Sequence, residues 1–295
     1  MATPLPPLAN LVQFPPGRTS PGPGEAPPAG WSSVVELAGG DGAPLATGVP
    51  PIFLVHGGIG NVVNLIGLAG ALAGLEKNRS IYGLEAAGSM GGTTDPTITA
   101  MAGRYVTAIR GIQAAGPYVL GGFSIGGGIA MEMAAQLTRS GDAASVIILD
   151  GHTSLAPPPD HHKGANLIAN ARESGLRRLV PWAWRQVRWK LGRRHSPEML
   201  RRLGNADPER LGYVDCEEAI FASGRAHSLR RVDVDVLLVK SAQLWPMYPS
   251  DYGWTPYVGG EFRVEVTPGD HLSMLDGPNV PALARAISRH LSRHL

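Results

Sequence analysis

The chain has 295 residues, of which 43% are hydrophobic and 17% charged, and its formal net charge is +2. These values indicate a globular protein that can bury a full core, and they exclude a disordered chain. A net charge near zero gives no electrostatic footprint for nucleic acid. The single cysteine, Cys216, excludes an intramolecular disulfide and favours a reducing, cytoplasmic location. No apolar run approaches the roughly 18 residues that cross a bilayer, so we expect no membrane role.

The N-terminal segment differs in composition from the rest of the chain. Residues 1–30 contain nine of the 26 prolines and almost no charge. A segment this rich in proline and glycine cannot build a packed core, so residues 1–31 are predicted to be an extended linker. It has no basic start followed by an apolar stretch, so a signal peptide is not predicted. The globular domain is expected over residues 32–295.

Short apolar runs alternate with helical patterns from residue 34 onward. The runs predicted as strands are 34–37, 51–55, 80–84, 118–122, 145–150, 234–240 and 262–266. The helical patterns cover 64–75, 97–113, 128–140 and 280–294. Continuous apolar runs bounded by glycine and proline are typical of strands buried on both faces. The alternation predicts an α/β fold, a mostly parallel sheet with helices on both faces.

A long insertion interrupts this alternation. More than 80 residues without a convincing strand separate Asp150 from Val234. Insertions after the strands of a parallel sheet lie at its carboxyl edge, where ligands bind, so we expect a helical lid over about 152–231. Residues 163–231 contain 15 of the 26 lysines and arginines but only seven acids. Either an ordinary solvated surface or a docking face for an acidic carrier protein accounts for this charge.

The sequence GGFSIGG at 121–127 predicts a nucleophile at Ser124. A serine between glycines, directly after a strand and before a helix, matches the strained turn known as a nucleophile elbow. The amide of Ile125, at the start of the helix, would face the oxyanion formed when Ser124 attacks a carbonyl. The sequence His56-Gly57-Gly58 ends an earlier strand, and Gly58 is the candidate for the second oxyanion amide.

A serine nucleophile needs a base, and His271 is the best candidate among nine histidines. It lies in TPGDHLSML, after the last strand, where hydrolases of this type carry the base. Among the other eight, His152, His161 and His162 follow the strand at 145–150, and His290 and His294 lie in a basic run that we expect to be exposed. The pair at 161–162 has no further spaced ligands, so no metal site is predicted.

Three aspartates compete for the role of the acid that orients His271. Asp150 ends the strand after the elbow helix and should lie beside Ser124 at the carboxyl edge. Asp251, in YPSDYGW after the next strand, occupies the other position that such folds use. Asp270 adjoins His271 in sequence, and its side chain should point away. We favour Asp150 and keep Asp251 as the alternative.

Several motifs together resemble a known family. The segments SSVVEL, PIFLVHGGIGN, SIYGLEAAG, YVLGGFSIGG and VTPGDHLSML are similar, in order and spacing, to the type I thioesterase domains that end nonribosomal peptide and polyketide synthases. The resemblance runs from about residue 32 to 293, and it implies an α/β-hydrolase fold with a lid. It also assigns the acid to Asp150, whereas repair-type thioesterases carry it near Asp251. One departure is the HGG turn, which replaces the more frequent H-P-A-G type.

The resemblance implies a reaction and a partner. An acyl, polyketide or peptidyl chain, held as a thioester on the phosphopantetheine arm of a carrier protein, would be transferred to Ser124. Water or a nucleophile of the chain itself would then release it, by hydrolysis or macrocyclisation. The domain itself would need no cofactor. The alternatives are a freestanding serine esterase or lipase acting on small esters, a repair-type (type II) thioesterase, and a hydrolase-fold binding module without activity.

Overall fold

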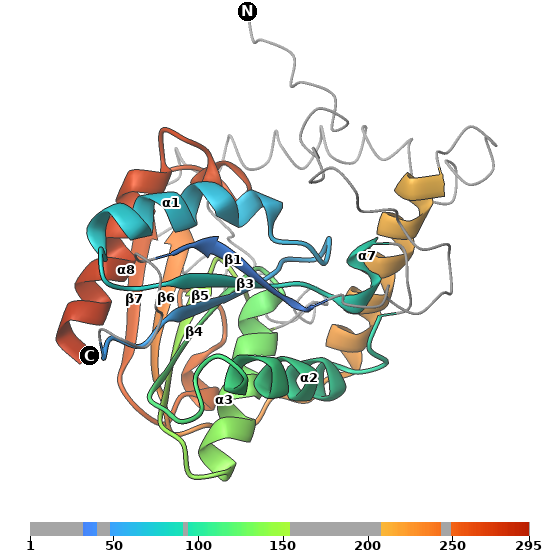
Figure 1. Cartoon of the computed structure of the whole chain (residues 1–295), viewed down its shortest axis with the longest axis horizontal. Helices are drawn as coiled ribbons and strands as arrows, with labels where there is room; N and C mark the ends of the chain where they lie inside the picture. The colour runs from blue at the N-terminus through green and yellow to red at the C-terminus, as the bar shows by residue number, and fades with distance from the viewer. Residues whose placement is uncertain (1–31, 40–47, 91–93, 154–207, 243–248, 295) are drawn as a thin grey trace, which may run out of the picture.

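The computed structural model describes residues 32–39, 48–90, 94–153, 208–242 and 249–294 (Figure 1). The predicted linker at 1–31 lies outside these residues. So does most of the predicted lid, including the greater part of its basic segment. The division into a linker and a domain with a lid therefore stays a prediction.

A seven-stranded sheet forms the centre of the molecule. Its spatial order is β1-β3-β2-β4-β5-β6-β7, and every neighbouring pair is parallel except β1 with β3. All seven predicted strands are present, which confirms the mostly parallel sheet. Their bounds are β1 (Val34–Ala38), β2 (Ile52–Val55), β3 (Ile81–Leu84), β4 (Tyr118–Phe123), β5 (Ala144–Leu149), β6 (Asp235–Ser241) and β7 (Phe262–Thr267).

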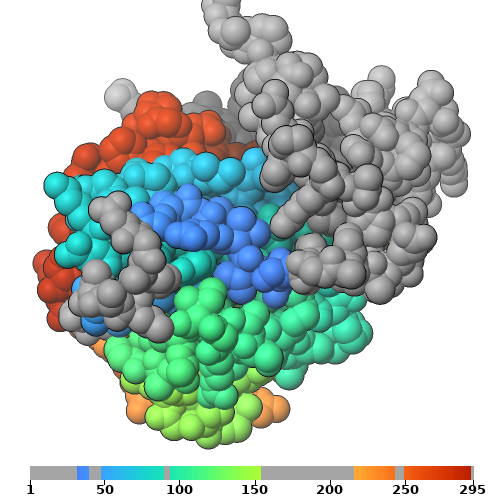
Figure 2. Space-filling view, in the orientation of Figure 1, coloured from blue at the N-terminus to red at the C-terminus, as the bar shows by residue number. Residues whose placement is uncertain are grey.

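Helices cover both faces of the sheet (Figure 1). The helices α1 (Ile66–Leu75) and α8 (Val280–His294) pack together on one face, and α2 (Ile98–Arg110) and α3 (Gly126–Arg139) on the other. Central strands such as β2 are buried along their whole length, because each face meets a layer of helices. The edge strand β1 instead reaches the surface between α1 and the α2–α3 layer (Figure 2). This arrangement is that of an α/β-hydrolase.

The C-terminal helix corrects one expectation. His290, expected in an exposed basic run, is only 3% exposed. It lies three residues after Ile287 and directly before Leu291, both of which belong to the core between α8 and the sheet. Helical periodicity therefore brings His290 onto the buried stripe despite the arginines around it.

One helix of the insertion lies within the described residues. The helix α7 (Pro208–Ala226) packs against the short η3 (Ala87–Met90) near the carboxyl edge of the sheet. Its Cys216 and Ile220 are buried there. None of the described helices is long and apolar enough to span a membrane.

Candidate active site

Ser124 occupies the turn between β4 and α3 with φ = 56°, a left-handed conformation that costs energy for a residue with a side chain. The turn is crowded around it. A Cβ atom built on Gly122 would lie 2.1 Å from the carbonyl oxygen of Gly126, and one built on Gly126 would lie 2.3 Å from that of His56. Neither position can carry a side chain without backbone movement. The local geometry is that of the predicted elbow.

Asp150 directly follows β5, the strand beside β4, and lies at the same height in the sheet as Ser124. Phe123 and Leu149 are partners in the register between β4 and β5, so Ser124 and Asp150 are the next residues of two adjacent strands. Asp150 is fully buried and also has a left-handed backbone, with φ = 50°. A Cβ built on the following Gly151 would lie 2.3 Å from the carbonyl oxygen of Ser124. The close approach of the two turns therefore requires glycine at 151.

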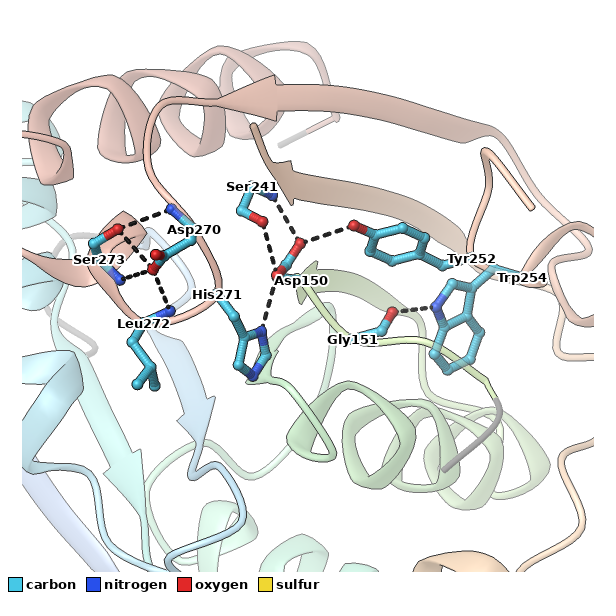
Figure 3. A network of polar contacts seen from close by, with 9 residues as sticks. All are labelled: Asp150, Gly151, Ser241, Tyr252, Trp254, Asp270, His271, Leu272 and Ser273. Atoms are coloured by element: carbon cyan, nitrogen blue, oxygen red, sulfur yellow. Dashed lines mark hydrogen bonds and ion pairs between the residues drawn. The ribbon is translucent and has the colours of Figure 1, made fainter. Parts of the chain in front are cut away.

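His271 follows β7 and meets Asp150. Its Nδ1 lies 2.9 Å from Oδ2 of Asp150, and its other ring nitrogen faces away from that carboxylate (Figure 3). The ring of Phe123, the residue before Ser124, stacks on the imidazole with a centroid distance of 4.8 Å and an interplanar angle of 23°. Hydrogen bond and stacking together fix the imidazole beside the elbow.

Two further residues hold the carboxylate of Asp150. The amide of Ser241 donates to Oδ1 at 2.7 Å, and its hydroxyl donates to Oδ2 at 3.0 Å. The hydroxyl of Tyr252 donates to Oδ1 at 3.2 Å (Figure 3). Burial opposes ionisation of Asp150, but the hydrogen bond and the charge of His271, together with the bonds from Ser241, outweigh it and hold the pKa below its usual value.

The sequence did not single out Ser241 or Tyr252. Ser241 ends β6 at the carboxyl edge, so the reasoning that located Asp150 also applies to it. Tyr252 carries no such signal, because it lies in a turn that has no periodic pattern. Burial and the neighbouring charge of Asp150 raise its pKa far above the usual value, so the hydroxyl stays protonated and can donate.

The two alternative acids have other partners. Asp251 accepts hydrogen bonds from the amides of Gly253 at 2.9 Å and Thr255 at 3.1 Å, and from the Thr255 hydroxyl. It thereby closes the turn that carries Tyr252. Oδ1 of Asp270 accepts hydrogen bonds from the amide and the hydroxyl of Ser273. Asp270 thereby closes the short loop between these two residues. Of the three candidates, Asp150 is the one that the structure brings to His271.

The HGG turn after β2 lies under a helix of the insertion. A Cβ built on Gly58 would lie 2.6 Å from Cε2 of Phe221 in α7, so the aromatic ring covers this glycine directly. A Cβ built on Gly57 would lie 2.8 Å from Cδ1 of Phe123. Ile125, the other predicted oxyanion residue, is the N-cap of α3, where the first amides of a helix have no intrahelical acceptor. Both predicted oxyanion residues thus lie near the elbow, at α3 and at the turn beside Phe123.

A buried histidine anchors the HGG turn. Nδ1 of His56 lies 2.5 Å from the carbonyl oxygen of Gly57, and its Nε2 lies 2.8 Å from the hydroxyl of Tyr105. Complete burial lowers the pKa of His56 to about 4, so the ring is neutral at pH 7 and carries one proton. Since a carbonyl only accepts, that proton lies on Nδ1, and Nε2 accepts from Tyr105. His56 therefore braces the turn that contains Gly58.

The cysteine and the remaining histidines and acids bear on two other kinds of site, a thiol nucleophile and a metal site. Cys216 is buried, and burial raises its pKa to about 12, so it remains an unreactive thiol near neutral pH. No group of three or more histidine, cysteine, aspartate or glutamate side chains in the described ranges is arranged to hold a metal ion. His161 and His162 lie outside these ranges.

Comparisons with known proteins identify the family of the chain. The family model of the thioesterase domain matches residues 50–291. Atromentin synthetase invA2 of Paxillus involutus is 28% identical over 82% of this chain and 27% of its own length. Non-reducing polyketide synthase crz7 of Cladonia metacorallifera is 26% identical over 83% of this chain and 12% of its length. The chain thus spans about a quarter or less of these curated relatives.

Solved structures give the same family. The NocB thioesterase domain, in a covalent complex with a fluorophosphonate nocardicin G analogue, is 26% identical and has a TM-score of 0.58. The match covers 82% of this chain and 95% of that one. Thioesterase domains of this type use no cofactor of their own, because the phosphopantetheine belongs to the carrier protein. The family model covers most of the chain, and the chain therefore belongs to the thioesterase domain family found in nonribosomal peptide and polyketide synthases.

Proposed function

We propose that this chain is a serine thioesterase that releases an acyl, polyketide or peptidyl chain from the phosphopantetheine thioester of a carrier protein. The observation that carries the proposal is the hydrogen bond between His271 and the buried Asp150 beside the elbow of Ser124. Nucleophile, orienting acid and base follow one another along the chain as Ser124, Asp150 and His271, the order of an α/β-hydrolase triad. The relatives with synthase names support the choice of a carrier-bound substrate.

The first half of the reaction forms an acyl-enzyme. The hydroxyl oxygen of Ser124 attacks the thioester carbonyl while Nε2 of His271 takes its proton. Asp150 holds Nδ1–H of His271 and stabilises the imidazolium. The amides of Gly58 and Ile125 donate to the oxyanion of the tetrahedral intermediate. Its collapse breaks the carbon–sulfur bond, and the departing phosphopantetheine thiolate receives the proton from His271.

The second half releases the chain. Water, or a hydroxyl or amine of the acyl chain, attacks the ester carbonyl, and His271 takes the proton of this nucleophile. Ser124 then leaves with that proton, and the product is a free acid or a ring. The balance between these products depends on how well water is excluded from the site.

Intact-protein mass spectrometry tests the proposal. The wild type, exposed to an acyl N-acetylcysteamine thioester or to a fluorophosphonate probe, should gain the mass of the acyl or phosphonyl group. Ser124→Ala should gain none, whereas Ser140→Ala, at the opposite end of α3, should behave as the wild type. Modification of Ser124→Ala would place the nucleophile elsewhere.

A second comparison separates the proposed substrate from simple esters. The value of kcat/KM should be much higher for an acyl chain on a carrier protein than for the ethyl ester of the same acid. Equal values, or a preference for the ester, would identify a freestanding esterase with the same triad.

A further inference from the structure

The glycines around the elbow fall into two groups. Cβ atoms built on Gly122, Gly126, Gly127 and Gly151 would lie between 2.1 and 2.7 Å from a neighbouring atom, so packing explains these glycines. A Cβ built on Gly128 would have no atom within 4 Å. Gly128 lies inside α3, where glycine is a poor helix former and its backbone has no left-handed φ to require it. Local packing therefore gives no reason for glycine at 128.

Gly128 lines a pocket next to the proposed catalytic residues. Ile125, which follows Ser124, and His152, two residues after Asp150, also line it. Gly128 lies in the first turn of α3, four residues after Ser124. The remaining wall consists of the apolar Ile98, Ile129, Leu229 and Trp254, together with Thr153, Gly224 and His227.

The size and chemistry of this pocket limit what it accepts. Its cavity volume is about 30 Å³, which is room for roughly two or three water-sized groups. His227, which also lines it, lies 3.6 Å from Glu132, and a second groove of about 480 Å³ shares Ile98 and His227 with the pocket. The apolar pocket and the more polar groove therefore adjoin at these two residues.

We infer that this pocket binds the first two or three carbon atoms of the acyl chain beyond the thioester carbonyl, and that Gly128 keeps it open. The inference rests on the proposed function, because the acyl group must be attached to Ser124 to enter the pocket. A Cβ atom at 128 has no protein atom within 4 Å, so a side chain there would extend into the space that these carbon atoms need. Gly128 is thus a determinant of acyl-chain selectivity.

The experiment measures kcat/KM for acetyl and hexanoyl N-acetylcysteamine thioesters. Burial of one methylene is worth about fourfold, so two or three buried groups should favour hexanoyl over acetyl by roughly 15- to 60-fold in the wild type. In Gly128→Leu, whose four-carbon side chain fills the pocket, this ratio should fall to within about threefold of unity. Gly128→Ala should give an intermediate ratio.

Gly70→Leu provides the matched control. Gly70 is also in a helix, α1, and a Cβ built on it has no atom within 4 Å, but it lies on the opposite face of the sheet. Both leucine variants should melt at or above the wild-type temperature, because leucine favours helix over glycine. Gly70→Leu should keep the wild-type ratio.

The possible failures have different meanings. A wild type that forms no acyl-enzyme with either thioester would overturn the proposed function. A wild type that is acylated but shows no preference for hexanoyl, or a Gly128→Leu variant with the wild-type ratio, would overturn the pocket and leave the function intact. Loss of the ratio in Gly70→Leu as well would also overturn the assignment to Gly128.

Discussion

The hydroxyl of Tyr252 donates a 3.2 Å hydrogen bond to Oδ1 of Asp150, the carboxylate whose Oδ2 meets His271. Tyr252 has a left-handed backbone, with φ = 53°, and is almost fully buried. The turn closed by Asp251 carries it. Asp251 and Asp150, the two acids between which the sequence left a choice, are thus connected through one tyrosine.

Tyr252→Phe should lower kcat by roughly tenfold with little change in KM. The reason is that a hydrogen bond to a charged group contributes about 1.5–3 kcal/mol, part of which orients the carboxylate toward His271. Tyr257→Phe, in the same segment, is the control, because its hydroxyl makes no hydrogen bond to the part of the chain that the structure describes. A Tyr252→Phe enzyme with full activity would show that Ser241 alone orients Asp150.

Asp150→Asn should be far more damaging than Asp251→Asn. In serine proteases, replacing the acid of the triad by its amide lowers kcat by about 10⁴-fold, and we expect a loss of roughly 10²- to 10⁴-fold here. In Asp251→Asn the amide oxygen of the new side chain would still accept from the backbone amides that close the turn, so this variant should retain most of the activity. Steady-state kinetics of both variants check this. The opposite ranking would reverse the assignment and favour a repair-type thioesterase.

The sequence predicted the parts of the fold and of the candidate site that depend on local pattern. Most of the strands follow from continuous apolar runs, although β1 and β7 also contain charged residues, and the glycines around Ser124 mark the tight turn. The role of Tyr252 could not be predicted, because it and Asp150 are 102 positions apart in the sequence. A contact over this separation produces no periodic pattern of residues that would reveal it. The expectation that His290 is exposed is wrong, because the helical period places it on the buried face of α8 despite its charged neighbours.

The contact between Gly58 and Phe221 gives a test of the proposed oxyanion turn. Gly58→Ala would bring a methyl group to 2.6 Å from Cε2 of the Phe221 ring, so the ring, the turn or α7 must move. Because loss of one oxyanion donor costs about 10²- to 10³-fold in kcat, we expect Gly58→Ala to lose roughly 10- to 100-fold.

Phe221→Ala tests the cause of that loss. If the clash with the ring displaces the turn, the double variant Gly58→Ala, Phe221→Ala should recover a large part of kcat relative to Gly58→Ala, after correction for Phe221→Ala alone. Double-mutant kinetics measure this coupling. Purely additive losses would mean that the two residues act separately and that the position of α7 does not control the turn.

His56 should make the stability of the fold depend on pH. Burial lowers its pKa in the folded state from 6.5 to about 4. Between these values the unfolded chain binds a proton that the native chain does not, so stability is complete above pH 6.5 and is lost as the pH falls toward 4. The two pKa values correspond to a loss of about 2 kcal/mol between pH 7.5 and pH 5.

Urea denaturation of the wild type and of His56→Asn at these two pH values measures the contribution of His56 to the free energy of unfolding, because the variant has no titrating group at position 56. The free energy of unfolding of the wild type should fall by about 2 kcal/mol more than that of the variant over this interval. His227, whose pKa burial also lowers, is present in both proteins, so its contribution cancels in the difference. Parallel pH dependences would mean that His56 is protonated in the folded state as readily as in the unfolded chain. Tyr105 would then have to accept a hydrogen bond from Nε2 rather than donate one to it. The claim that a neutral His56 supports the turn containing Gly58 would then be wrong.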